Sequence, residues 1–361
     1  MSRGSAGWFG VWDIFSKSAA KSSRRVQRAV GKAISKAALS HATEMGKTTR
    51  HVLSGVVSPA PAPGGRGTGR WEKGRWGAGP LLMRDYRLFI PPGVSASRPA
   101  PLLVLLHGCG QDAASFAACT RAAAIARAER CVVLLPEQAS HASPQRCWNW
   151  YRAKSHVAAE AIALMAIVDH VCNGQPVRRD RVFAMGISAG GAMALTLALR
   201  FPERFAAVGT HSGATPHSAI NAIQAAQSMH GRRSADTEAL RHGLGGRLLP
   251  PLIVLHGDAD HVVAFDNAHA SASLWLDLLP HDPPKPSRIR DVQRGARRPH
   301  SISDWKLAAR PYVRLVRING LGHAWSGGAR NQAFSDPTGP DALKIALRFF
   351  TDSTVVKRKL R

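Results

Sequence analysis

The chain has 361 residues, of which 45% are hydrophobic and 20% are charged, so it can bury a full core and is not a small scaffold stapled by disulfides. Lys and Arg number 49 against 23 Asp and Glu, a formal net charge of +26 that attracts anionic polymers or membranes. No apolar run approaches the length of about 18 residues that a membrane span needs. We therefore expect a globular protein that is soluble or at most peripheral.

Many of the basic residues lie in an N-terminal extension, residues 1–58. Val26, Val30 and Ile34 recur at every fourth position, and most basic side chains of this stretch fall elsewhere on the same helix. The pattern predicts a partly helical extension that binds an anionic membrane or a polymer granule. A helix docked on its own domain, or a solvated tail, is the alternative.

Proline and glycine fill residues 59–78, which predicts a linker. The main domain is then expected at residues 79–351, and a basic tail at residues 352–361. A secretory signal peptide needs a continuous apolar stretch near the start, and none is visible. The cytoplasm is therefore one expected location.

Apolar, strand-like runs alternate with helical patterns along the expected domain. This order is typical of a mostly parallel sheet with helices on both faces, an α/β fold. The expected strands are residues 82–90, 102–106, 131–135, 182–185, 205–209, 252–255 and 313–318, and the expected helices are residues 158–171, 192–200 and 341–350.

The sequence Gly186-Ile187-Ser188-Ala189-Gly190 stands between an expected strand and an expected helix. A GxSxG motif in that context is typical of a nucleophile elbow, in which a serine is held on a sharp turn. Small residues are needed at Gly186 and Gly190 because neighbouring backbone comes close. Ser188 is thus the expected nucleophile, and a glycine-rich turn that caps a helix is the alternative.

A serine nucleophile needs a base and an acid that orients the base, and both follow later strands. Asp258 and Asp260 come directly after the run at 252–255, and His323 lies in the loop after the run at 313–318. We expect Ser188, Asp260 and His323 to form a catalytic triad. Asp258 is the competing acid, and Asp260 is preferred because it stands three residues after Gly257.

Acyl transfer also needs hydrogen-bond donors aimed at the developing oxyanion. The backbone amides of Ala189 and Cys109 follow the nucleophile and an early strand, so both are expected in the oxyanion hole; a plain tight turn is the alternative for the loop at Cys109. The five cysteines show no CxxC pair and no zinc spacing, so no metal is expected. No organic cofactor is implied either.

Seven motifs between residues 86 and 350 resemble the short-chain-length polyhydroxyalkanoate (PHB) depolymerases, a family of esterases. The resemblance implies an α/β-hydrolase fold, the Ser188, Asp260 and His323 triad, hydrolysis of 3-hydroxyacyl polyesters, and an extracellular location. The motifs are Leu106-His107-Gly108-Cys109, Leu135-Pro136-Glu137-Gln138, Cys147-Trp148-Asn149-Trp150, Gly186 to Gly191, His211-Ser212-Gly213, His256-Gly257-Asp258 and Gly322-His323-Ala324-Trp325-Ser326-Gly327-Gly328.

Further site residues follow from the same resemblance. Trp148, Trp150 and Trp325 resemble the substrate-lining aromatics of the family, and buried packing is the alternative for the first two. A disulfide between Cys109 and Cys147 is expected because each belongs to a family motif and lies in a loop after a strand; two reduced buried cysteines are the alternative.

The expected substrate is a polyester or a small ester. Residues 217–247 and 281–312 look like insertions that form a lid or lie disordered on the surface. Only a short basic stretch follows residue 350 in this sequence, so we expect no polymer-binding module there and consider a soluble oligomeric ester as a substrate beside crystalline polymer. A feruloyl or acetylxylan esterase is an alternative activity, and a non-catalytic protein that binds anionic surfaces or granules is an alternative of another class.

Overall fold

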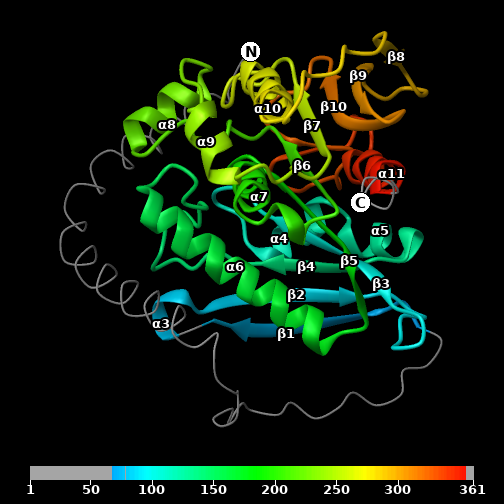
Figure 1. Cartoon of the computed structure of the whole chain (residues 1–361). Coiled ribbons are helices and arrows are strands. Elements are labelled where there is room, and N and C mark those ends of the chain that lie inside the picture. Colours follow the sequence, from blue (N-terminus) through cyan, green and yellow to red (C-terminus); the bar gives the residue numbers. More distant parts are fainter. Residues whose placement is uncertain (1–66, 78, 355–361) are drawn as a thin grey trace, which may run out of the picture. The chain divides into compact units, whose positions relative to one another are not determined.

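Ten strands form the central sheet of the computed structural model, which describes residues 67–77 and 79–354 (Figure 1). Their order across the sheet is β1-β2-β4-β3-β5-β6-β7-β10-β9-β8. Two short strands, β11 (Trp325–Ser326) and β12 (Ser335–Asp336), pair with each other outside this sheet. The described residues belong to one compact unit that begins at Arg66.

Six parallel strands make the middle of the sheet. Every residue of β4, β6 and β7 is buried, as continuous apolar runs require when helices cover both faces. Each strand overlaps one expected from the sequence. The six are β3 (Ala100–Leu106), β4 (Val132–Pro136), β5 (Val177–Ile187), β6 (Ala207–His211), β7 (Leu252–Gly257) and β10 (Arg310–Ile318).

Antiparallel strands extend both sides of the parallel strands. On one side β1 (Arg70–Trp76) pairs with β2 (Arg84–Ile90), and β2 pairs with β4. On the other side β9 (His300–Leu307) pairs with β10 and with the edge strand β8 (Arg290–Val292).

These outer strands change two sequence-based expectations. Strand β1 lies inside the segment expected as a linker, because its charge-rich, mostly exposed residues fit an edge strand. The segment 281–312 is neither a lid nor disordered, because β8, β9 and the start of β10 build it into the sheet. The segment 217–247 forms two surface helices, α8 (Ala222–Met229) and α9 (Thr237–Leu244).

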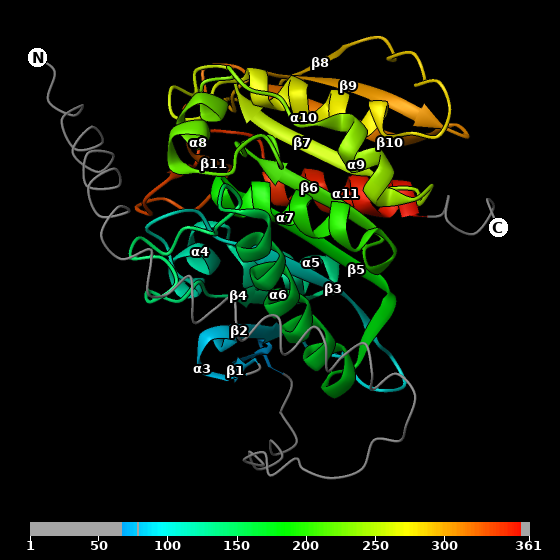
Figure 2. The same ribbon diagram turned by 60° about the vertical axis from the view of Figure 1, so that its left-hand side comes forward.

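Helices cover both faces of the sheet (Figure 2). Helices α4, α5 and α11 share one face, where Phe116, Ile125 and Phe350 pack against β3, β4 and β5 in the main hydrophobic cluster. Helices α6, α7 and α10 cover the other face. The helices are α3 (Gly79–Leu82), α4 (Ala113–Cys119), α5 (Ala122–Glu129), α6 (Lys154–Gly174), α7 (Ala189–Arg200), α8 (Ala222–Met229), α9 (Thr237–Leu244), α10 (Asp266–Asp277) and α11 (Ala342–Thr354), with a 3₁₀ turn at Pro202–Arg204.

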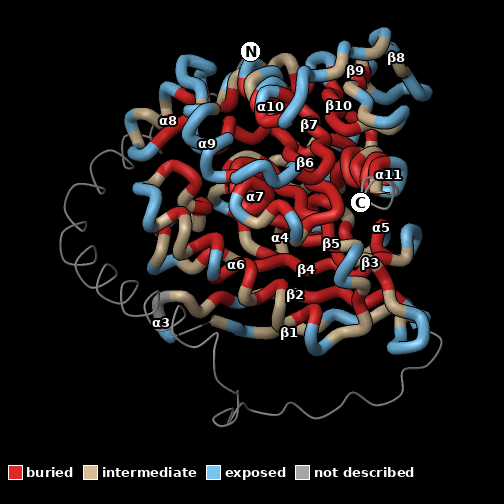
Figure 3. The backbone as a smooth tube through the Cα atoms, in the orientation of Figure 1, coloured by how far each residue is buried: buried red, intermediate tan, exposed pale blue. Residues whose placement is uncertain are grey.

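Burial is greatest along the parallel strands and decreases toward the outer strands (Figure 3). Helix α6 is 21 residues long and, by length and composition alone, apolar enough to cross a membrane. That is weak support for a span, because core helices pass the same test and more than half of its apolar window is buried in the fold. The expected N-terminal extension lies outside the described residues.

Candidate active site

Ser188 stands in the turn between strand β5 and helix α7. Its backbone has φ 55° and ψ −123°, a combination that residues other than glycine rarely adopt and that is typical of a strained nucleophile elbow. A Cβ atom on Gly190 would collide with the carbonyl oxygens of Leu106 and His107, and one on Gly186 would collide with the backbone of Gly190. The small residues therefore let the elbow lie directly against the end of β3.

Asp260 and His323 are in direct contact. The Nδ1 atom of His323 lies 2.8 Å from Oδ2 of Asp260, and because a carboxylate only accepts, Nδ1 carries the hydrogen. The neutral ring then has its lone pair on Nε2, the atom that a general base uses. The second carboxylate oxygen, Oδ1, accepts the backbone N–H groups of Val262 and Val263, each at 2.9 Å.

The carboxylate of Asp260 is held in its ionised form. Burial opposes ionisation, but hydrogen bonds from His256 and His323 outweigh burial and keep the pKa of Asp260 well below its usual range. His256 reaches the same oxygen as His323, with Nε2 at 3.4 Å from Oδ2. Asp260 is therefore a fixed negative charge beside the His323 ring.

Asp258 is engaged elsewhere. Its carboxylate accepts the backbone N–H of Gly320 at 2.7 Å and pairs with Arg317, whose terminal nitrogen lies 3.0 Å away. These contacts join the loop after β7 to the loop after β10. The geometry therefore favours Asp260 over Asp258 as the acid, in agreement with the preference from sequence.

Ser188 lies at the same edge of the sheet as the Asp260–His323 pair, because the three residues follow the parallel strands β5, β7 and β10. His211, the last residue of strand β6, forms hydrogen bonds to the segments that carry Ser188 and His323. The N–H of Ser188 donates to the carbonyl of His211 at 2.9 Å, and Nε2 of the His211 ring accepts the N–H of Ser326, three residues after His323, at 3.2 Å.

The two expected oxyanion donors lie in the elbow itself and in the loop after β3. Ala189 is the first residue of α7, so its amide lies at a helix N-terminus. Cys109 follows the end of β3, and a disulfide joins it to Cys147, the pairing expected from the sequence. The side chain of Gln111 accepts the N–H of Gly108 at 2.9 Å, which further restrains this loop.

The three tryptophans expected to line a substrate site are buried, with exposed fractions of 0% for Trp148, 5% for Trp150 and 1% for Trp325. Trp148 donates from Nε1 to the carbonyl of His107 at 3.0 Å. The Trp325 ring stacks on His211 at 5.1 Å between ring centroids. Buried packing therefore describes all three rings, and contact with substrate is not supported by their burial.

A buried ionic cluster behind the Cys147 loop was not anticipated from the sequence. Glu160 of α6 accepts the backbone N–H of Asn149 at 2.6 Å and the side-chain amide of Gln138, and its carboxylate lies 3.8 Å from a nitrogen of Arg84. Burial raises the pKa of Glu160, against the effect of these partners. The one sequence signal was an acidic residue on the apolar side of a predicted helix.

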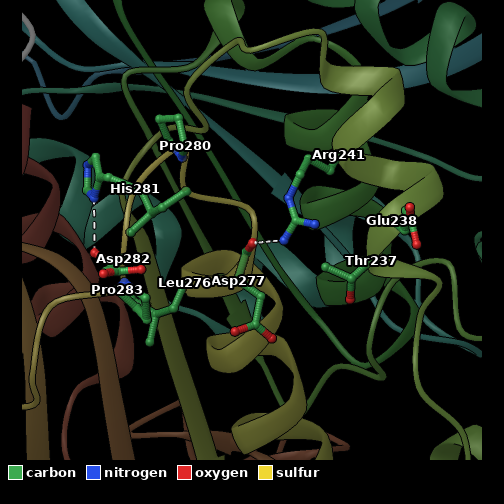
Figure 4. A pocket seen from close by; sticks show the side chains of 10 residues that line it. Thr237, Glu238, Arg241, Leu276, Asp277, Pro280, His281, Asp282 and Pro283 are labelled. Atoms are coloured by element: carbon green, nitrogen blue, oxygen red, sulfur yellow. Dashed lines mark hydrogen bonds between the residues drawn. The ribbon is translucent and has the colours of Figure 1, made fainter.

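A surface hollow of about 590 Å³ lies between α9 and the end of α10 (Figure 4). Helix α10 starts beside Asp260 and runs antiparallel to β7, so its end lies at the opposite edge of the sheet. In residues 67–77 and 79–354, no group of three or more His, Cys, Asp or Glu side chains is arranged to hold a metal ion. The hollow is lined by Thr237, Glu238, Arg241, Leu276, Asp277, Leu279, Pro280, His281, Asp282 and Pro283.

Curated relatives of this chain are esterases. Poly(3-hydroxyalkanoate) depolymerase C of Paucimonas lemoignei is 27% identical over 258 residues, covering 69% of this chain and 60% of that protein. Poly(3-hydroxybutyrate) depolymerase of Ralstonia pickettii is 23% identical, over 72% of this chain and 54% of that protein. Feruloyl esterase B of Neurospora crassa is 27% identical, over 56% of this chain and 73% of that protein. The matches thus span somewhat more than half the length of the two depolymerases.

Structural comparison shows the same fold. The acetyl xylan esterase of Aspergillus awamori superposes with a TM-score of 0.61 at 14% identity, over 78% of this chain and 99% of that one. The family model described as Esterase PHB depolymerase matches residues 84–281. These residues include the elbow, the oxyanion loop and Asp260. The chain therefore belongs to the PHB depolymerase family of carboxylic ester hydrolases, which have the α/β-hydrolase fold.

Proposed function

We propose that this esterase hydrolyses poly- or oligo-(3-hydroxybutyrate)-type esters through an acyl-enzyme on Ser188. The observation that carries the proposal is the strained elbow of Ser188 at the same sheet edge as the Asp260–His323 pair, which are joined at 2.8 Å. An activated serine, a neutral imidazole and a buried carboxylate are the three parts that acyl transfer needs.

In the proposed mechanism, Oγ of Ser188 attacks the ester carbonyl carbon while Nε2 of His323 takes its proton. The carbonyl oxygen becomes an oxyanion that accepts hydrogen bonds from the amides of Ala189 and Cys109. The alcohol leaves with the proton from His323, and the acyl group stays on Ser188. Water then attacks the acyl-enzyme, His323 again takes and returns the proton, and the 3-hydroxy acid is released. Asp260 stabilises the imidazolium in both steps.

The polyester substrate is supported by the family match and by the two depolymerases among the relatives. A feruloyl or acetylated-sugar ester is the second candidate, favoured by the relative named a feruloyl esterase and by the similar fold of an acetyl xylan esterase. Both candidates use the same residues. They differ only in the acyl and alcohol groups that the site accepts.

Fluorophosphonate labelling followed by peptide mapping tests the proposed nucleophile. We expect one adduct, on Ser188, and none in Ser188→Ala. Turnover should then be compared on hydroxybutyrate oligomers, feruloyl esters and acetylated xylan, and we expect the highest kcat/KM on the oligomers. An adduct on another serine would remove the nucleophile assignment, and preference for a feruloyl or acetyl ester would remove the polyester assignment alone.

The basic extension is proposed to hold the enzyme on an anionic membrane or polymer-granule surface. This part of the proposal rests on sequence, because residues 1–58 lie outside the described residues. Replacing Arg25, Arg28, Lys32 and Lys36 by Gln in the full-length chain should weaken sedimentation with anionic vesicles or granules, and binding of the wild type should fall with added salt. Turnover of a soluble ester should not change. Equal sedimentation of both proteins would exclude this role.

Export from the cell is also proposed, as the family resemblance implies. The Cys109–Cys147 disulfide supports it, because structural disulfides persist in oxidising compartments. Fractionation of the native host, with alkylation of thiols before lysis, tests the location. Protein found only in the cytosol, with both cysteines alkylated, would contradict export.

A further inference from the structure

Three buried histidines stand where parallel strands of the sheet end. His107 directly follows β3, His211 is the last residue of β6, and His256 is the residue before the last of β7. All three residues have an exposed fraction of 0%. None of the three is the expected general base, and an imidazole that is completely buried needs a reason, since burial costs free energy unless its polar atoms are bonded.

Each ring is bonded to backbone atoms of a loop. His107 accepts the N–H of Gln138 on Nε2 at 3.1 Å, and its Nδ1 lies 2.8 Å from the carbonyl of Gly108. His211 accepts the N–H of Ser326 on Nε2 at 3.2 Å. His256 donates from Nε2 to the carbonyl of Val263 at 2.9 Å.

The three loops are those that carry the proposed catalytic groups. Gly108 precedes the oxyanion donor Cys109. Ser326 follows the base His323, and the N–H of Val263 itself donates to the carboxylate of Asp260. Each imidazole thus joins the rigid end of a strand to one loop of the site.

The bonds that His107 and His211 accept require neutral rings, because a protonated Nε2 cannot accept a hydrogen bond. Burial lowers the pKa of His107 to about 4. Burial, with the nearby His256 and His323, lowers the pKa of His211 to about 3, against the opposing charge of Asp260. Both rings therefore keep their acceptor over the range in which a histidine base works.

We propose that His107, His211 and His256 are positioning residues that hold the oxyanion, base and acid loops in register with the sheet. The inference rests on the proposed function, because it assigns these loops their catalytic roles. It applies most sharply to His211, whose carbonyl accepts the N–H of Ser188 while its ring holds the loop of His323. One residue thus fixes the nucleophile and the base relative to each other.

His211→Leu and His211→Gln separate positioning from packing. Leu fills most of the ring volume without an acceptor, whereas Gln can place an amide oxygen near the position of Nε2. For a soluble p-nitrophenyl ester we expect His211→Leu to lower kcat about 100-fold, as a misplacement near 1 Å does, with KM nearly unchanged. His211→Gln should recover most of the lost kcat.

Thr210→Val is the matched control. Thr210 precedes His211 on β6, has an exposed fraction of 1%, and its hydroxyl has no hydrogen-bond partner among the described residues. The substitution removes a buried polar atom from the same strand and should leave kcat and KM within about twofold of wild type, as expected for a change that breaks no hydrogen bond. If His211→Leu does not fold, His211→Gln is compared with His211→Asn, whose side chain is shorter. We then expect His211→Asn to lose kcat and His211→Gln to keep most of it.

The outcomes distinguish the two proposals. A kcat of His211→Leu equal to wild type, or equal losses in His211→Leu, His211→Gln and Thr210→Val, would overturn the positioning role. Undiminished turnover in Ser188→Ala would overturn the proposed function itself. The test extends to His107 and His256, each replaced by Leu and, in a second variant, by Gln. If the Leu variants lose kcat at both sites and the Gln variants do not recover it, the inference is restricted to His211.

Discussion

The two edges of the parallel strands differ in how they hold polar groups. At the carboxyl edge, Asp260, His211 and His256 are buried, and each bonds to a named partner at a fixed distance. At the amino edge, the hollow between α9 and α10 is larger than a small ligand but lined by exposed charges. Arg241 there donates to the carbonyl of Asp277 (Figure 4), and both residues are exposed.

The difference teaches that cavity volume alone does not locate chemistry. A charge in water interacts weakly with its neighbours, whereas the same charge in a buried, bonded position has a fixed direction and a strong field. The carboxyl edge has the buried, hydrogen-bonded charges. We therefore expect substitution of the catalytic groups at this edge to change activity by orders of magnitude, and substitutions at the hollow to change it little.

The largest effect is expected at the nucleophile. Ser188→Ala should lower kcat by about four to six orders of magnitude, because the acyl-enzyme cannot form. The melting temperature should change little, since Ala keeps the Cβ atom and the same strained backbone as Ser188. Hydrolysis of a p-nitrophenyl ester measures kcat, and thermal unfolding measures the melting temperature. Turnover near that of wild type would contradict the carboxyl-edge assignment.

The next-largest loss of kcat is expected at one of the two aspartates after β7. Asp260→Asn should lower kcat about 10⁴-fold, because the amide favours the wrong tautomer of His323. Asp258→Asn removes only the charge that pairs with Arg317 and should cost less than about tenfold, as for a partly exposed ion pair. Steady-state kinetics of both variants on one ester measure the ratio. The reverse order would transfer the acid role to Asp258.

The disulfide is expected to affect stability more than chemistry. Replacing Cys109 and Cys147 by Ala opens a loop with a sequence separation of 38, which should lower the free energy of unfolding by about 4 kcal/mol. Urea unfolding of the oxidised wild type and the double variant measures the loss. Cys172→Ala, at a buried free cysteine, is the control. Equal stability of the wild type and the double variant would contradict the prediction.

Stability should also fall on acidification. The folded state holds the pKa of His107 at about 4, below its ordinary value of 6.5. Between these values the unfolded chain binds a proton that the folded chain does not, so the free energy of unfolding falls as pH decreases, by about 3 kcal/mol for this ring. Denaturant unfolding at several pH values measures the slope, and His107→Gln should flatten it. An unchanged slope would show that His107 does not contribute.

The smallest effect is expected at the hollow. Arg241→Ala and Asp277→Ala alter two exposed side chains that line the hollow, at the edge of the sheet opposite the candidate active site. Turnover and KM on a soluble ester should stay within about twofold of wild type, as for ordinary surface substitutions. A tenfold change in either constant would mean that the amino edge contributes to the reaction and would weaken the contrast between the edges.

Short-range patterns predicted the parts of the fold that depend on local chemistry. The apolar runs ended by His107-Gly108 and Pro136 became β3 and β4, and the GxSxG context located the elbow. Strand β1 was missed because an exposed edge strand has no apolar alternation, and its Gly74 is typical of a linker. Helix α5 was also missed, since its short alanine-rich sequence has few large apolar residues to set a period.

The site was predicted in part for the same reason. Ser188, Asp260 and His323 stand beside strand ends, so position selects them, and family motifs suggested Cys109 with Cys147. The burial of Trp148 and Trp325 depends on which loops cover them, and no local pattern contains that information. The contacts of Glu160 with Asn149 and Arg84 join three distant segments, so they emerge only when the chain is folded.

The buried pair formed by Arg84 and Glu160 limits which amino-acid substitutions this sequence can accept. Both side chains are almost completely buried, at 4% and 3% exposed, so loss of one leaves the other buried without its opposite charge, at a cost of about 3–5 kcal/mol, whereas joint replacement of such a pair by apolar residues of similar volume is often nearly neutral. We therefore expect each single substitution to destabilise the fold more than the double substitution does. Although Arg84 in strand β2 and Glu160 in helix α6 are 76 positions apart in the chain, we expect them to be replaced together.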